Sequence, residues 1–152
     1  MADVLTARQR SYCMSRIRGK DTKPEHFIRH GLFALGFRYR LHRRDLPGCP
    51  DLVFPKHFAV IFVHGCLWHG HECHLFQWPA TNADFWRNKI MRNRERDAHA
   101  VQQLRSAGWR VLTVWECAIK GRRRMSPTKL IDRIAQWLRS NRVRSEIGEN
   151  EC

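Results

Sequence analysis

Eight consecutive residues of this chain contain two thiols and two imidazoles, in the order Cys66-Leu67-Trp68-His69-Gly70-His71-Glu72-Cys73. Thiolate sulfur and imidazole nitrogen are the ligands that zinc prefers, and a closed structural site needs four of them around a tetrahedron. The two cysteines, His71 and the later Cys117 would complete such a site, although His74 or His69 could replace Cys117. The alternative is that the cysteines are small buried hydrophobes and the histidines are surface residues. So dense a group of soft ligands favours zinc.

A second set of residues could bind a harder cation. Asp51 stands at the predicted start of one strand, and the next strand ends at Phe62-Val63-His64. A carboxylate, a backbone carbonyl and a histidine brought together there could surround Mg²⁺, which takes oxygen ligands and keeps several waters. Such an arrangement cleaves phosphodiesters, although the usual signature has an acid and a lysine where this chain has Phe62 and His64. Taken alone, Pro50-Asp51 fits a turn-forming aspartate with no metal better than a metal site.

The composition suits a protein that binds a polyanion. The 152 residues are enough for one domain with its own core, and their formal net charge is +14. Basic residues gather in three segments, 8–23, 38–44 and 87–96, and again in 120–124. No basic segment has the strong apolar face of an interfacial helix. We therefore expect the partner to be nucleic acid and not a membrane.

The chain shows no sign of export. Residues 1–10 mix charges without the apolar stretch of a signal peptide, and the longest apolar run, 58–63, is far too short to cross a bilayer. We therefore expect a cytoplasmic protein. Its six cysteines would then be reduced and available to a metal.

Hydrophobic periodicity and turn signals predict an α/β sandwich around a mixed sheet. We expect helices over about 23–35, 82–106 and from 126 onward, and strands over 37–41, 51–54, 58–63 and 109–115, with a hairpin at 51–63. Residues 139–152 have almost no apolar content and are predicted to be a disordered tail. The chain therefore divides into a basic DNA-binding arm at 1–21, a folded domain at 22–138 and the tail at 139–152.

One series of short motifs is specific. They are Pro50-Asp51, Phe62-Val63-His64-Gly65-Cys66, Trp68-His69, His71, Cys73, Pro79-Ala80-Thr81, Phe85-Trp86, Glu95-Arg96-Asp97, Gly108-Trp109-Arg110-Val111-Leu112 and Val114-Trp115-Glu116-Cys117-Ala118. Together they resemble the very-short-patch repair endonucleases over about residues 14–137. The resemblance implies a strand-specific nickase that cuts double-stranded DNA 5′ of the thymine in a T:G mismatch left by deamination of 5-methylcytosine. It also implies a restriction-endonuclease-like three-layer fold, a monomer on nucleoid DNA, and accessory mismatch-repair proteins as partners.

The resemblance also implies a role for each matching residue. Asp51 and the carbonyl of Val63 would bind the catalytic Mg²⁺, Glu25 and His64 would hold its waters, and His69, oriented by Asp97, would activate the attacking water. The structural Zn²⁺ would be held by Cys66, His71, Cys73 and Cys117, which agrees with the spacing of these residues. The residues that enter or flank the DNA stack would be Leu67, Trp68 and Trp86.

The chain departs from the family pattern at three positions. Leu67 replaces an aromatic residue, which implies a more purely apolar wedge. Val63 replaces a polar residue, but a backbone carbonyl can bind the ion whatever side chain the residue has. Gly70 stands where the family often has another histidine. Two other functions stay open at this point: a non-catalytic, zinc-stabilised DNA-binding module, and a restriction endonuclease that cuts both strands of unmismatched DNA.

Overall fold

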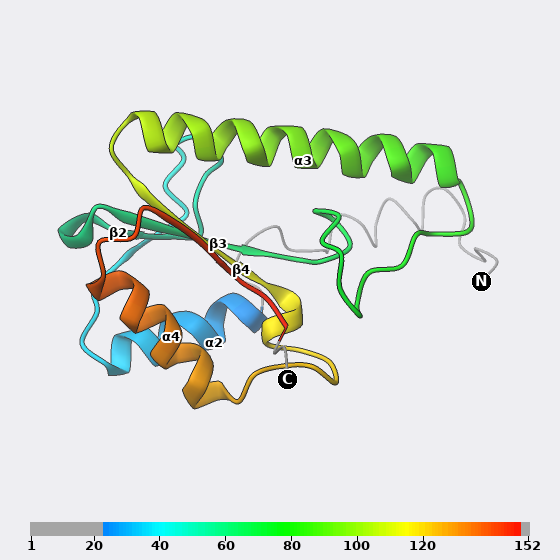
Figure 1. The fold of residues 1–152 in the computed structure, drawn as a ribbon. Helices are drawn as coiled ribbons and strands as arrows, with labels where there is room; N and C mark the ends of the chain where they lie inside the picture. Colours follow the sequence, from blue (N-terminus) through cyan, green and yellow to red (C-terminus); the bar gives the residue numbers. More distant parts are fainter. Residues whose placement is uncertain (1–22, 150–152) are drawn as a thin grey trace.

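The computed structural model describes residues 23–149, in which one five-stranded sheet lies between a long helix and two shorter helices (Figure 1). The helices are α2 (Lys23–Ala34), α3 (Ala83–Ser106) and α4 (Pro127–Arg139). The strands are β1 (Arg40–Leu41), β2 (Leu52–Phe54), β3 (Ala59–His64), β4 (Arg110–Trp115) and β5 (Arg144–Ile147). They lie in the sheet in chain order; β1, β2 and β3 pair antiparallel, and β3, β4 and β5 pair parallel. The predicted mixed sheet is confirmed, whereas the predicted arm at 1–21 lies outside the described residues.

Alternate residues of the strands form two apolar cores, one on each face of the sheet. Leu52 and Phe54 of β2 belong to the core that contains Ile28 of α2 and the apolar side of α4. Val53, between them, belongs to the other core, with Leu104 of α3. Because both faces are covered, β2, β3 and β4 are nearly continuous apolar runs. Figure 1 shows α3 on one side of the sheet and α2 with α4 on the other.

The prediction of a disordered tail is wrong for part of its length. After α4 ends at Arg139 the chain returns to the sheet, where β5 pairs with β4 and places Ile147 beside Val114. Ile147 is 3% exposed and joins the core of α2 and α4. A short edge strand with a single buried residue leaves almost no hydrophobic pattern in the sequence, which is why composition alone suggested disorder.

Smaller differences occur at the ends of elements. Of the predicted strand at 37–41, only Arg40 and Leu41 pair with β2. Asn82 precedes α3 with a left-handed backbone (φ 56°) and makes no side-chain capping hydrogen bond. Ser126 does cap α4, because its hydroxyl accepts a hydrogen bond from the N–H of Lys129 at 3.3 Å. No described helix is long and apolar enough to cross a membrane.

Candidate active site

Asp51, immediately before β2, lies beside the end of β3. Its Oδ2 accepts a hydrogen bond from the N–H of Val63 at 2.7 Å. β2 pairs with β3 only as far as Leu52 opposite Ile61, so the backbone of Val63 extends past the last paired residue of β2. The hairpin register therefore brings the predicted carboxylate and the predicted strand end together.

Two further side chains lie close to Asp51. Nε2 of His42 is 2.7 Å from Oε1 of Glu25, and Nδ1 of His42 is 3.8 Å from Oδ1 of Asp51. Glu25, in the first turn of α2, is only 1% exposed. The candidate ligand atoms of these three residues all lie within 4.8 Å of one another. Two carboxylates and an imidazole at such spacing form a donor set suited to a divalent cation.

The charge of this group also favours a cation. Burial raises the pKa of Asp51 to about 7; the N–H of Val63 opposes the rise, and the neighbouring Glu25 adds to it. A carboxyl group with that pKa keeps its proton in the metal-free protein at slightly acidic pH. A divalent cation between the carboxyl groups would release the proton and offset their repulsion.

A second group lies where the loop after β3 meets α3. Nδ1 of His69 is 2.5 Å from Oδ2 of Asp97 in α3. His64, the last residue of β3, stacks on His69 with ring centroids 3.8 Å apart. Burial and the nearness of His69 lower the pKa of His64 to about 3, against an opposing effect of Asp97. The carboxylate engages one nitrogen of His69, which leaves the other nitrogen to exchange a proton.

A small cavity gives access to this second group. It has a volume of about 260 Å³ and is lined by the stacked histidines and by Gly48, Asn93 and Arg96, among others. Arg96 is exposed at its edge. A guanidinium beside a histidine–carboxylate pair is suited to an anionic group such as a phosphate.

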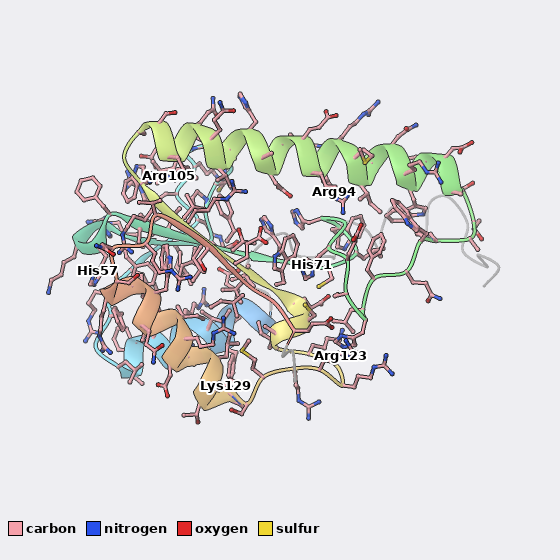
Figure 2. The ribbon with its side chains drawn as sticks, viewed as in Figure 1. His57, His71, Arg94, Arg105, Arg123 and Lys129 are labelled. Atoms are coloured by element: carbon pink, nitrogen blue, oxygen red, sulfur yellow. The ribbon has the colours of Figure 1, made fainter. Side chains whose placement is uncertain are left out.

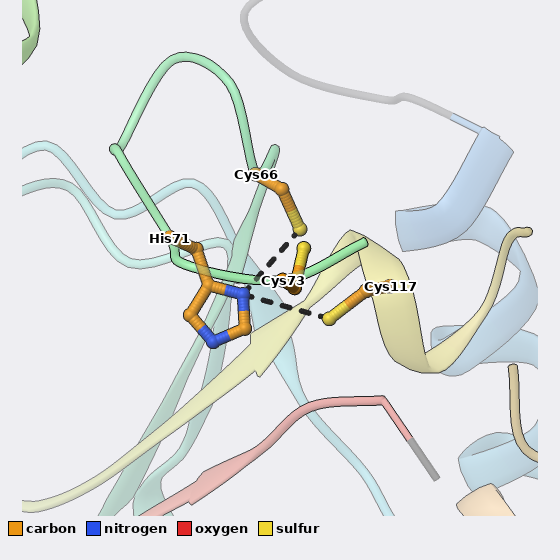
Figure 3. A group of neighbouring side chains, drawn as sticks. All are labelled: Cys66, His71, Cys73 and Cys117. Carbon is orange, nitrogen blue, oxygen red and sulfur yellow. Dashed lines mark hydrogen bonds between the residues drawn. The ribbon is translucent and has the colours of Figure 1, made fainter. Parts of the chain in front are cut away.

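The four predicted zinc ligands converge in a third group (Figure 3). Nδ1 of His71 lies 3.6 Å from Sγ of Cys66 and 3.5 Å from Sγ of Cys117. Cys66 and Cys117 are fully buried, and the ligand atoms of all four residues, Cys73 included, lie within 4.8 Å of one another. Three thiols and one imidazole at such distances form the donor set of a closed tetrahedral site.

The thiols influence one another strongly. The pKa of Cys117 is lowered to about 6. The hydrogen bond with Cys66 is the largest cause, the nearness of His71 acts in the same direction, and burial opposes both. The same hydrogen bond, together with burial, raises the pKa of Cys66, and burial raises that of Cys73. Only one of the three thiols ionises readily without a cation. A metal ion would make all three ionise, because thiolate is the form that binds it.

The two alternative fourth ligands have other partners. His69 is paired with Asp97, and Nδ1 of His74 contacts a carboxylate oxygen of Glu149, the residue that follows Gly148 after β5. His74 was considered only as a substitute ligand from the sequence. Its partner lies in the segment predicted to be disordered, so no sequence pattern indicates that these two residues pair.

Two of the predicted wedge residues, Leu67 and Trp68, lie in the loop after β3, and the third, Trp86, lies in the first turn of α3. Trp68 and Trp86 pack against each other with ring centroids 5.3 Å apart, and the ammonium group of Lys89 lies 5.1 Å from the Trp68 ring centroid. Leu67 and Trp68 are both partly exposed. The structure therefore brings the two tryptophans together beside a cation, and Leu67 precedes Trp68 in the loop after β3.

Side chains of α3 make hydrogen bonds to the backbone of the loop 66–73. Asn93 donates a hydrogen bond to the carbonyl of Trp68 at 2.7 Å, and Arg94 donates one to the carbonyl of Gly70. Figure 2 shows Arg94 below α3, on the side of His71. Gly70 has a φ of 64°, and a Cβ there would lie 2.6 Å from Ile90. This backbone therefore has no room for the histidine that often stands at this position in the family.

Trp115 lies between the candidate zinc ligands and the stacked histidines. Its ring stacks on His71 with centroids 4.1 Å apart and planes 6° apart, and it meets the edge of His64 at 5.4 Å. The zinc-type group and the stacked histidines therefore share one buried indole. Sequence reasoning placed Trp115 in a strand and gave it no role at the site.

Sequence reasoning also missed His42. The pairing of β1 with β2 determines its position, because Leu41 pairs with Leu52, which puts His42 opposite Asp51. The strand at Arg40–Leu41 is only two residues long, so its register could not be fixed from the sequence pattern.

The chain is similar to known proteins of one family. A family described as "DNA mismatch endonuclease Vsr" matches residues 2–75. The DNA mismatch endonuclease Vsr of Escherichia coli is 43% identical over 138 residues, which cover 91% of this chain and 88% of that protein. The Type II nicking enzyme V.XorIIP of Xanthomonas oryzae pv. oryzae is 48% identical over 119 residues, 78% of this chain and 88% of that enzyme. V.NmeAIP of Neisseria meningitidis, also a Type II nicking enzyme, is 43% identical over 122 residues, 80% of this chain and 87% of that enzyme.

The class is therefore that of the DNA endonucleases. Within it, this chain belongs to the family of Vsr DNA mismatch endonucleases. The family named from the sequence motifs is confirmed.

Proposed function

We propose that this protein nicks one strand of duplex DNA on the 5′ side of the thymine in a T:G mismatch. The observation that carries the proposal is the contact of 2.5 Å between His69 and Asp97, beside the stacked His64 and next to Arg96. A non-catalytic DNA-binding module would not need a partly buried histidine–carboxylate pair at an open cavity. The names of the related nicking enzymes favour a single-strand cut over a double-strand cut.

His69 would act as the general base in this reaction. Asp97 holds one ring nitrogen, which fixes the tautomer and leaves the other nitrogen unprotonated and able to take a proton from the attacking water. His64 stays neutral because burial and His69 lower its pKa to about 3, so it adds no positive charge beside the base. Arg96 would hold the phosphate in the position that in-line attack by the water requires.

The residues around Asp51 fit Mg²⁺. The carboxylate lies against the backbone of Val63, and because N–H and C=O of one strand residue point to the same side, the carbonyl of Val63 faces the same space as its N–H. Asp51 and that carbonyl would hold the ion, and the resemblance gives its waters to Glu25 and His64. When bound there, Mg²⁺ would polarise the scissile phosphate and stabilise the leaving oxyanion.

The residues of the third group fit structural Zn²⁺. Four protein ligands leave no open position for a substrate, so the ion would stabilise the fold without taking part in the reaction. It would hold the loop 66–73 against the strand end at Trp115, and thereby the positions of His69 and Trp68.

The packed pair of Trp68, in the loop after β3, and Trp86, in α3, would read the mismatch. Trp68 and Trp86, with Leu67 beside them, would wedge into the base stack. A T:G pair stacks and pairs less well than a normal step, so opening it costs less and selectivity follows. The net charge of +14 would supply the affinity for the phosphate backbone. We also propose that the arrangement of α3, sheet and paired helices is the restriction-endonuclease-like fold.

One assay tests the proposed function. The protein is incubated with Mg²⁺ and end-labelled duplexes that carry T:G, C:G or T:A at one position. A nick in the thymine strand of the T:G duplex alone is the expected result. Binding without cleavage would support a DNA-binding module, and cleavage of both strands of the C:G duplex would support a restriction enzyme.

A further inference from the structure

The two residues that follow β5, Gly148 and Glu149, lie against the candidate zinc ligands. β5 ends at Ile147, whose side chain is anchored in the core, so the next residues have a fixed starting point. A Cβ added to Gly148 would lie 3.3 Å from Cε1 of His71 and 3.7 Å from Sγ of Cys117. Figure 3 shows this part of the chain, in red, below the same two side chains. The backbone at Gly148 therefore packs directly against two of the four candidate ligands.

Glu149 holds the residue that follows a third candidate ligand. Its Oε2 accepts a hydrogen bond from the backbone N–H of His74 at 3.3 Å and also contacts Nδ1 of that residue. His74 directly follows Cys73, and its side chain is only 6% exposed. The other carboxylate oxygen of Glu149 lies 3.5 Å from Nη1 of Arg123. One carboxylate therefore joins the chain after Cys73 to the loop before α4.

The ring of His74 is enclosed from another side as well. Gly121, in the loop before α4, has a φ of 92°, and a Cβ there would collide with Nε2 of His74. The N–H of Leu75, the next residue, donates a hydrogen bond to Sγ of Cys73 at 3.4 Å. Such a hydrogen bond stabilises the ionised form of a thiol, which is the form that binds a metal. By holding His74, Glu149 therefore fixes the backbone that stabilises this thiolate.

We infer that Gly148 and Glu149 form the outer wall of the zinc site, and that Glu149 is a positioning residue that keeps the ion bound. The inference rests on the proposed function only in placing Zn²⁺ at the third group. The loop that this ion would hold carries His69 and Trp68, so the wall would help to position both. Contacts outside the ligands typically contribute 10–100-fold to metal affinity. Loss of the wall should therefore weaken zinc binding although all four ligands remain.

Transfer of zinc to a chelator tests the inference without DNA. Zinc-loaded proteins are mixed with an excess of pyridylazoresorcinol, whose absorbance reports the ion that has been released. We expect deletion of residues 148–152 and Glu149→Ala to speed release about 10–100-fold, because the outer contacts are lost. Deletion of residues 150–152 alone should leave the rate unchanged, as should Glu146→Ala at an exposed glutamate of β5. Glu149→Gln should give an intermediate rate, because the amide oxygen can still accept the hydrogen bond from His74.

A further variant separates zinc retention from general stability. Leu104 is fully buried in the core on the α3 face of the sheet. Leu104→Ala should therefore lower the free energy of unfolding and leave zinc release unchanged in the folded protein. Urea denaturation of the zinc-loaded proteins measures the stability of each variant beside its release rate.

Each outcome decides the inference. A wild-type release rate in folded Glu149→Ala would overturn it, and this variant alone decides if deletion of residues 148–152 prevents folding. Equal acceleration by Leu104→Ala would also overturn it, because the effect would then be a general loss of stability. A wild type that binds no zinc overturns the proposed metal and this inference together, whereas zinc that is held equally well by all variants contradicts only this inference. A protein that shows the expected release rates but does not nick T:G duplexes contradicts only the proposed function.

Discussion

The rings of His64 and His69 lie face to face, with centroids 3.8 Å and planes only 5° apart. Only His69 has a carboxylate partner, since Asp97 lies 2.5 Å from its Nδ1. His64 is kept neutral above about pH 4, because burial and His69 lower its pKa to about 3. Two residues of the same type therefore have different surroundings at one site, and this difference supports the proposal that His69 is the proton acceptor.

Removing the ring of His69 should abolish most of the nicking and little of the binding. We expect His69→Ala to lower the single-turnover rate about 10²–10⁴-fold, the usual contribution of a general base. Asp97→Asn should lower it by a smaller factor, because the amide can still accept the ring hydrogen but lacks the charge. Single-turnover cleavage at saturating DNA separates the chemical step from binding. A rate within tenfold of the wild type in His69→Ala would place the base elsewhere.

The affinity for the catalytic cation should depend on pH through Asp51. Its pKa is raised to about 7, so below that pH the cation must displace a proton. We expect the half-saturating Mg²⁺ concentration to rise about tenfold for each pH unit below the pKa, and to level off above it. Calorimetric titration of the protein with Mg²⁺ between pH 5.5 and 8.5 measures this. A flat profile would exclude Asp51 as the titrating ligand.

The raised pKa of Asp51 should also make the stability of the metal-free protein depend on pH. Because the folded-state pKa of Asp51 is raised, the metal-free fold is stabilised at low pH and loses stability as the pH rises through about 7. Asp51→Asn should remove this slope and leave the metal-free protein on the order of 2 kcal/mol more stable than the wild type at pH 8, while it abolishes nicking. Chemical denaturation of the zinc-loaded proteins without added Mg²⁺ at several pH values measures this effect apart from binding of the catalytic cation.

Much of the fold could be predicted from the sequence, because its main elements carry strong local signals. The period of α4, with Pro127 in its first turn and Ser126 before it, is an unambiguous helix start. The apolar runs of β3 and β4 are covered on both faces and could be placed within a residue or two. β5 could not be predicted, since only one of its side chains is buried.

The candidate site, too, could be predicted only in part from the sequence. Three of the four candidate zinc ligands, Cys66, His71 and Cys73, stand within eight residues, so their density alone indicated zinc. The pair of His69 and Asp97 is 28 residues apart in the chain, and only the resemblance to a known family suggested it. His42 was missed, because its position depends on the register of a strand of two residues.

Cys117 should be required for zinc and for stability together. It joins the loop 66–73 to the strand end at Trp115, so Cys117→Ala should remove a ligand and lower the free energy of unfolding by several kcal/mol, since zinc binding contributes to folding. Elemental analysis and thermal unfolding measure the two effects. Cys49→Ala is the matched control, because Cys49 is exposed and outside the group. A full zinc content in Cys117→Ala would exclude it as a ligand.

Trp68 should contribute more to DNA binding than to folding. Its ring is partly exposed and packs on Trp86 at 5.3 Å outside the two main cores. We expect Trp68→Ala to weaken binding to T:G duplexes by about 1–3 kcal/mol, the usual value for a base stacked on an aromatic ring. Trp78→Ala, at another half-exposed tryptophan, should leave the ratio of T:G to C:G binding unchanged. An unfolded Trp68→Ala protein would show that the ring serves the core.

The C-terminal strand should be part of the stable fold. Ile147 is 3% exposed and packs into the core of α2 and α4, next to Val114 in the sheet. Ile147→Ala should cost about 2 kcal/mol of unfolding free energy, the low end for removing a buried isoleucine, because an edge strand can partly close the cavity. Val143→Ala, four residues earlier and 48% exposed, should change stability by less than about 0.5 kcal/mol. Urea denaturation of the zinc-loaded proteins measures both changes. If the two variants were equally stable, β5 would not be anchored by Ile147, and the disordered tail expected from the composition would describe the protein in solution.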